Sequence, residues 1–151
     1  MTADTRGSVA FFVVVSDWND AAERARLIRE RVFIEEQGVP RELEWDEHDE
    51  VARHALAFAE HGRVVGTGRL LADGHVGRMA VLRRWRGCGI GTAILRALVA
   101  EATHLGMAQL VLHAQTHAVG FYARFGFLSE GEEFMEAGIP HVKMRRPLAA
   151  G

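Results

Sequence analysis

The chain has 151 residues, of which 48% are hydrophobic and 25% are charged. This composition is typical of one globular domain, residues 1–151, and excludes the disordered and fibrous classes. The formal net charge of -2 lacks the basic excess of most proteins that bind nucleic acid or membrane surfaces, so neither partner is expected. The one cysteine, Cys88, cannot form an internal disulfide, and the first residues show no signal-peptide pattern. These features predict a cytoplasmic protein.

The first third of the chain predicts a strand, a helix and a polar loop. Residues 9–15 are β-branched and aromatic, which predicts a buried strand. A helix is predicted next, because apolar residues recur at helical spacing. These residues are Ala21, Ala25, Ile28 and Val32. Residues 41–50 are polar and strongly acidic, which indicates an ordered loop.

Three strand-like stretches follow, at residues 54–59, 63–71 and 75–82. They are separated by His61-Gly62 and Asp73-Gly74, both short enough for hairpin turns, and Asp-Gly is a favoured type I′ pair. This part of the chain therefore predicts an antiparallel meander.

The remaining elements predict a mixed sheet. A strong amphipathic helix is expected from residue 89 to about 105, and a short helix at residues 119–125. Strands are expected at residues 109–114, 127–132 and 141–146. A meander that passes through a helix into another strand indicates the α+β class, with a mixed, mostly antiparallel sheet flanked by helices.

A glycine-rich turn joins the predicted strand 75–82 to the predicted helix. Its glycines, at positions 87, 89 and 91, leave backbone N–H groups uncovered, and the helix start adds unsatisfied donors and a partial positive charge. Three arginines lie beside it, at positions 83, 84 and 86. This pattern predicts a pyrophosphate site, although an ordinary turn that binds nothing has the same local sequence. The dinucleotide-binding and P-loop spacings are both absent.

Arg86-x-x-Gly89-x-Gly91 at a helix start resembles the Gln/Arg-x-x-Gly-x-Gly/Ala signature of GNAT acetyltransferases. Residues 79–81 are similar to the fourth strand of that family, and residues 114–127 to its segment ending in Phe-Tyr-x-x-x-Gly-Phe. Two further stretches, 32–37 and 138–144, resemble the ElaA/YjcF-like branch. The resemblance implies a GNAT-like sheet of about seven strands, splayed between the fourth and fifth, and an N-acetyltransferase that uses acetyl-CoA.

The resemblance also implies where acetyl-CoA binds. The backbone of Met79, Ala80 and Val81 would hold the pantetheine arm, and one amide there would stabilise the oxyanion as an amine attacks the thioester in a ternary complex. Gln115 takes the place of an Asn that contacts the cofactor in many relatives. Arg86 and the amides of the turn would hold the pyrophosphate. The turn residues are Gly87, Cys88, Gly89, Ile90, Gly91 and Thr92.

Tyr122 matches the usual general acid of the family, which would protonate the departing CoA thiolate. A phenol pKa of about 10 lies roughly 1.5 units above that of a thiol, so hydrogen bonding to the developing charge is enough for a useful role. An amine of lysine type is almost fully protonated at neutral pH, so a base or a water relay is also expected. Glu36 is the first candidate base, His117 the second and His113 the third, with a structural role as the alternative for each.

Other features leave alternatives open. The acidic stretch 42–50 would suit a cationic amine, and a solvated charged loop explains it equally well. The histidines show no metal-ligand spacing, so no metal is expected. The main alternative function is a non-catalytic acyl-CoA-binding regulatory module of the same fold. A homodimer is a further alternative. The acceptor, a small-molecule or a peptide amine, is not specified.

Overall fold

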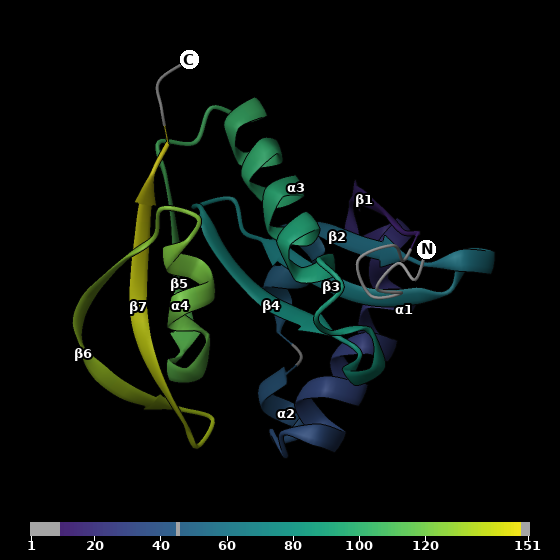
Figure 1. The fold of residues 1–151 in the computed structure, drawn as a ribbon, viewed down its shortest axis with the longest axis horizontal. Helices are drawn as coiled ribbons and strands as arrows, with labels where there is room; N and C mark the ends of the chain where they lie inside the picture. The colour runs from purple at the N-terminus through teal and green to yellow at the C-terminus, as the bar shows by residue number, and fades with distance from the viewer. Residues whose placement is uncertain (1–9, 45, 149–151) are drawn as a thin grey trace, which may run out of the picture.

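The computed structural model describes residues 10–44 and 46–148, so Val9 of the first predicted strand and the N-terminal residues searched for a signal lie outside it. A seven-stranded sheet with the order β1-β2-β3-β4-β5-β7-β6 forms its centre (Figure 1). The β4–β5 pair is parallel and the other five pairs are antiparallel, which confirms the predicted mixed α+β sheet. The strands are β1 (Phe12–Ser16), β2 (Arg53–Phe58), β3 (Val64–Leu70), β4 (His75–Val81), β5 (Gln109–Gln115), β6 (Leu128–Glu136) and β7 (Ile139–Pro147).

Helices cover both faces of the sheet. In Figure 1, α3 (Ile90–His104) lies in front of the strands and α1 (Trp18–Arg29) lies behind them. Each helix buries its predicted apolar stripe, and Ile28 of α1 and Leu98 of α3 are completely buried. The shorter helices are α2 (Arg41–Glu44) and α4 (Val119–Ala123). Directly after α1, the chain continues as a π-helix, η1 (Glu30–Glu36), in which the Gln37 N–H donates to the Val32 carbonyl.

Two glycines of β3 let α3 pack directly against the backbone of the sheet. A Cβ added at Gly68 would lie 2.8 Å from Ile94 Cγ2 and 2.9 Å from Met79 Sδ, and one at Gly66 would lie 2.9 Å from Ile94 Cδ1. Such distances are too short for real carbon contacts, so larger residues would push the helix away. The start of α3 is thereby held close to the end of β4.

One of the two predicted hairpin turns of the meander differs from the prediction. His61 and Gly62 both have positive φ angles, 62° and 72°, as a type I′ turn requires. Asp73 is not among the described non-glycine residues with positive φ, so the prediction of a type I′ turn at Asp73-Gly74 is wrong. Gly74 alone has positive φ there, 95°, and the Asp73 carboxylate accepts from the His75 N–H at 3.1 Å. This is the three-residue loop in which glycine follows a type I turn.

Candidate active site

The sheet splays between β4 and β5. The two strands pair at His75↔Val111 and Val76↔Leu112, and beyond Val76 the described residues of β4 pair with β3. A bulge lies just past this point, because Arg78 and Met79 of β4 face Gly68 alone on β3. Arg78 has a positive φ of 50° there. The segment from Met79 to Val81 therefore presents a backbone edge to the space between the strands, as expected for a pantetheine site.

The glycine turn begins with a 3₁₀ turn, η4 (Arg83–Trp85), and ends at the first residue of α3. Gly87 and Gly89 have φ angles of 78° and 86°, and a Cβ on either would meet nothing within 4 Å. They are required by their backbone conformation rather than by lack of space. Gly89 caps α3 without a side-chain hydrogen bond, and the first helical bond runs from the Ala93 N–H to the Gly89 carbonyl at 3.1 Å. The amides before Ala93 thus remain available to an anion.

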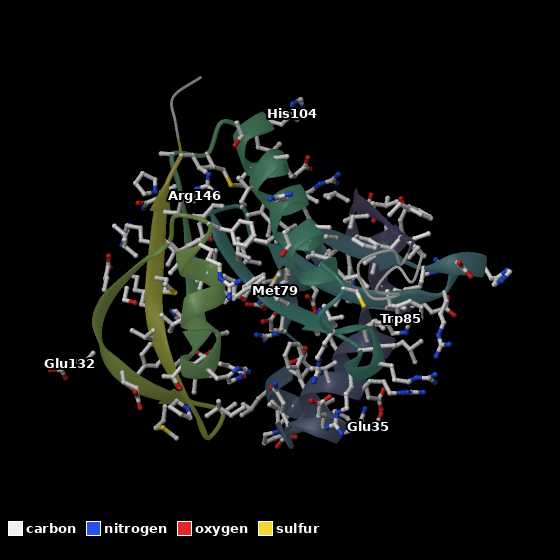
Figure 2. The ribbon with its side chains drawn as sticks, viewed as in Figure 1. Glu35, Met79, Trp85, His104, Glu132 and Arg146 are labelled. Carbon is white, nitrogen blue, oxygen red and sulfur yellow. The ribbon has the colours of Figure 1, made fainter. Side chains whose placement is uncertain are left out.

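A cavity of about 920 Å³ lies on the α1 side of the splay. Segments from η1 to β7 line it, and they include Tyr122 on α4 as well as most residues predicted for the site. In Figure 2, Met79 lies near the centre of the molecule and Trp85 at the turn before α3. The predicted residues that line the cavity are Glu36, Met79, Ala80, Val81, Arg86, His113, Gln115, His117 and Tyr122. Gly87 to Thr92 follow directly after Arg86, outside this lining.

The side chain of Arg86 points to the acceptor side rather than along the turn. Its Nη1 and Nη2 donate to the two carboxylate oxygens of Glu36 at 2.7 and 2.8 Å, and its Nε donates to the Val81 carbonyl at 2.9 Å. These hydrogen bonds, with the nearby charge of Arg83, lower the pKa of Glu36. A carboxylate held in this way is a weak proton acceptor. The geometry therefore argues against Glu36 as the base.

Gln37, Gln115 and His117 form a hydrogen-bonded chain across the splay. The Gln115 amide donates to Gln37 Oε1 at 3.1 Å, and Gln115 Oε1 lies 2.7 Å from His117 Nε2. Because an amide oxygen accepts, His117 Nε2 carries the proton and its Nδ1 is left with the lone pair. The chain connects the end of η1 to the end of β5. It gives the predicted residues Gln115 and His117 defined orientations at the cavity wall.

Tyr122 lies on α4, partly buried between the rings of Phe121 and Phe127, with centroid distances of 5.1 and 6.0 Å. Burial raises the pKa of Tyr122 to about 12. The phenol therefore keeps its proton at any physiological pH and can donate a hydrogen bond into the cavity that it lines.

A buried ionic network supports the wall made by residues 41–51. Arg29 Nε donates to Glu44 at 2.6 Å, and Arg29 Nη1 donates to Asp49 at 2.8 Å, all within the core. Arg69 contacts Asp46 and Asp49, and Arg78 contacts Glu44 and Asp46. Burial raises the pKa of Glu44, although Arg29 and Arg78 oppose the effect.

The structure corrects the loop predicted for residues 41–50. The stretch forms α2 and a 3₁₀ turn, η2 (Glu47–Val51), and its acids divide into two sets. Glu44, Asp46 and Asp49 pair with arginines. Glu42, Glu47 and Glu50 are exposed, as a solvated charged segment predicts. The role of Arg29 was not predicted. A signal was present, because Arg29 continues the four-residue spacing of Ala21 and Ala25 on the buried stripe.

The opposite wall of the cavity carries imidazoles around one carboxylate. Glu136 Oε1 lies 2.9 Å from His113 Nδ1, and its Oε2 lies 3.7 Å from His141 Nε2. His141 Nδ1 donates to the Ile139 carbonyl at 2.7 Å. The sequence analysis considered His113 alone, since Glu136 and His141 reach it only through the pairing of β5, β6 and β7.

Three further findings concern the Cys88 thiol, groups that could bind a metal ion, and helices that could span a membrane. The Cys88 thiol lies 3.8 Å from the Arg86 carbonyl within the turn. Among the described residues, no group of three or more His, Cys, Asp or Glu is placed to hold a metal ion. None of the helices in residues 10–44 and 46–148 is long and apolar enough to cross a membrane.

Comparisons with known proteins agree with this geometry. Residues 15–148 match the family model described as an acetyltransferase (GNAT) domain. The uncharacterized N-acetyltransferase YjcF of Bacillus subtilis (strain 168) is 38% identical over 138 residues, covering 88% of this chain and 97% of YjcF. The crystal structure of Escherichia coli ElaA superposes with a TM-score of 0.80 at 26% identity, covering 89% of this chain and 99% of ElaA.

An acyl-CoA N-acyltransferase from Pseudomonas aeruginosa also superposes with a TM-score of 0.80 at 26% identity, covering 91% of this chain and 99% of that one. The likeness spans most of the chain, because the family model matches residues 15–148. The chain is therefore a member of the GNAT acetyltransferase family, in the branch similar to ElaA and YjcF, and an acyltransferase whose co-substrate is an acyl-CoA.

Proposed function

We propose that this protein is an N-acetyltransferase that transfers the acetyl group of acetyl-CoA directly to an amine in a ternary complex. The observation that carries the proposal is one cavity that joins the free edge of β4 to Tyr122 and to oriented imidazoles. The pyrophosphate binds the free amides from Gly87 to Thr92, and the pantetheine arm lies along Met79, Ala80 and Val81. The helix start supplies partial positive charge for the phosphates.

In the chemical step, the amine nitrogen attacks the thioester carbon. A C–N bond forms, the C–S bond breaks, and the carbonyl oxygen gains negative charge that a β4 amide stabilises. Tyr122 donates a hydrogen bond to the departing sulfur. Its pKa of about 12 lies some 3.5 units above that of a free thiol, so complete transfer would cost about 5 kcal/mol in water. The same apolar surroundings raise the pKa of the thiol, which reduces this difference.

The attacking nitrogen must lose a proton, and His117 is the better of the two first candidates to accept it. Arg86 occupies both oxygens of Glu36, whereas His117 donates through Nε2 and keeps a lone pair on Nδ1. Glu36 then serves to fix η1 beside the cofactor strand. Gln115 orients His117 and also borders the path expected for the cofactor.

The test is a thiol-release screen with acetyl-CoA and a panel of amines, which include peptides with free N-termini, lysine analogues, amino sugars and small aliphatic amines. Tyr122→Phe serves as the matched variant, since it removes only the hydroxyl. We expect kcat to fall about 100-fold or more in Tyr122→Phe, with unchanged acetyl-CoA affinity. Acetyl-CoA binding without thiol release from any amine would instead favour the regulatory acyl-CoA-binding module.

A further inference from the structure

We propose that the acceptor is an amine that carries a second positive charge, and that Glu136 binds this charge. The inference rests on the proposed N-acetyltransferase function and names the substrate class of the same cavity. It starts from the carboxylates that line the cavity among the described residues. These are Glu36, Glu44 and Glu136.

Arginines neutralise two of these carboxylates. Glu36 is held by both terminal nitrogens of Arg86, and Glu44 is held by Arg29 and Arg78. Glu136 differs, because its partners are the imidazoles of His113 and His141. An imidazole is not a permanent cation as a guanidinium is, so Glu136 lacks the fixed positive partner that Glu36 and Glu44 have. A cation that enters the cavity therefore finds its electrostatic partner at Glu136.

One oxygen of Glu136 is open to a new donor. His113 Nδ1 donates to Oε1 at 2.9 Å, which orients the carboxylate. His141 Nδ1 is used by the Ile139 carbonyl, and His141 Nε2 lies 3.7 Å from Oε2, which is beyond hydrogen-bond distance. The Glu136 side chain is 47% exposed, so an ammonium group can reach it.

Aromatic packing keeps this subsite in shape. The Phe134 ring meets His113 edge to face at 5.1 Å and stacks on His141 at 6.0 Å, so it holds both imidazoles against Glu136. Ring faces beside a carboxylate suit an alkylammonium group better than a bare metal ion, because its methylenes pack on the rings while its charge meets the carboxylate.

The charge that Glu136 binds is distinct from the reacting nitrogen. The reacting nitrogen must be neutral and must lie near the β4 edge and Tyr122, whereas Glu136 lies at the end of β6. A cavity of about 920 Å³ is at the upper end of the usual range for small-molecule sites, so it accepts a molecule longer than a simple amine. One end of a diamine or polyamine can then bind Glu136 while the other end reacts.

The experiment compares three acceptors that share one primary amine and a four-carbon chain: butane-1,4-diamine, 4-aminobutan-1-ol and 4-aminobutanoate. We expect kcat/KM for the diamine to exceed that for the amino alcohol about 10- to 100-fold, and the amino acid to be the poorest. Glu136→Gln should abolish the preference for the diamine over the amino alcohol, mainly through KM.

Glu132→Gln is the matched control, because Glu132 lies on the same strand and projects outward from the molecule in Figure 2. It should keep the preference for the diamine. Equal kcat/KM for diamine and amino alcohol, or a preference that survives Glu136→Gln, would overturn the proposal and leave N-acetyltransferase activity intact.

Binding provides a readout that does not depend on turnover. Calorimetry of butane-1,4-diamine with the CoA-bound protein should show binding that weakens at least about 10-fold in Glu136→Gln and is unchanged in Glu132→Gln. That result would support the subsite even where acetyl transfer fails. Absence of diamine binding to the wild-type protein would contradict it.

Discussion

The glycine turn and the cavity offer different groups to a ligand. The turn offers backbone amides from consecutive residues, and its shape follows from the positive φ angles of Gly87 and Gly89. The cavity offers side chains from η1 to β7, and partners distant in sequence orient Glu36, His113 and Gln115. The comparison teaches that a backbone site is encoded locally, whereas a side-chain site depends on the assembled sheet.

Arg86 belongs to both regions. The motif places it in the glycine turn, but its side chain does not point along the turn. Its backbone precedes the turn, as the resemblance implies, but its guanidinium contacts Glu36 on η1 and the Val81 carbonyl on β4. The residue thus ties the acceptor wall to the cofactor strand. A change in Arg86 is expected to affect both halves of the site.

The largest effect is expected for the buried ionic network that supports α2 and η2. Arg29→Met leaves Glu44 and Asp49 buried without this cation, so we expect the free energy of unfolding to fall by about 3–5 kcal/mol. Urea denaturation followed by circular dichroism measures this. Arg31→Met, an exposed change four residues before Glu35, should cost less than about 0.5 kcal/mol. Equal losses in both variants would show that the network adds little.

The next effect tests whether the turn depends on backbone conformation. Gly89→Ala places a Cβ at a φ of 86°, which costs about 1–2 kcal/mol and displaces the amides. We expect acetyl-CoA binding, measured by calorimetry, to weaken about 10-fold. Gly91→Ala is the matched control, since its Cβ would meet Phe121 at an ordinary 3.7 Å. Alanine within a helix should raise stability by up to about 1 kcal/mol and leave binding unchanged. Similar binding losses in both variants would contradict this account.

A smaller effect separates the two candidate bases. Because Arg86 lowers the pKa of Glu36, this carboxylate stays ionised at pH values where a free glutamate is protonated, and the stability it provides is lost only as pH falls through that lowered pKa. An imidazole base predicts that kcat/KM falls on the acidic side of the pH profile, because a protonated ring has no lone pair to accept a proton. Glu36→Gln should keep that limb and lower stability by no more than about 1 kcal/mol. If the fall of kcat/KM at low pH disappeared in Glu36→Gln, Glu36 would again be the better candidate for the base.

The smallest expected change concerns Tyr122 at high pH. With a pKa of about 12, only about 1% of the phenol is ionised at pH 10, so no activity should be lost there through its deprotonation. Tyr122 is the one tyrosine of the chain, so ultraviolet titration reports it directly. A midpoint near 10 would show that the side chain is open to water.

Much of the fold could be predicted because its signals are local. The stripe of α1 and the strands of the meander follow from periodicity, although Asp73-Gly74 shows that a favoured dipeptide does not decide a turn type when the loop has a third residue. The resemblance implies that Tyr122 and Gln115 belong to the site, and both line the cavity. Their proposed roles remain predictions.

The acceptor side could not be predicted because long-range pairing decides it. Glu36 looked like a free base until the fold placed Arg86, fifty residues later, against both its oxygens. From the sequence, the acidic stretch 42–50 was a candidate for binding a cationic substrate. The fold instead places Arg29 against Asp49 and Arg69 against Asp46. Charge counts along a chain do not reveal which charges are already compensated.

The sequence by itself therefore determined most of the strands and helices, the family and the position of the glycine turn, since each depends on neighbouring residues and on backbone conformation. The tertiary structure alone decided which carboxylates remain unpaired and how Gln115 orients His117. The physical reason is that ion pairs and hydrogen bonds between side chains form between whichever groups the packed strands bring within about 3 Å of one another.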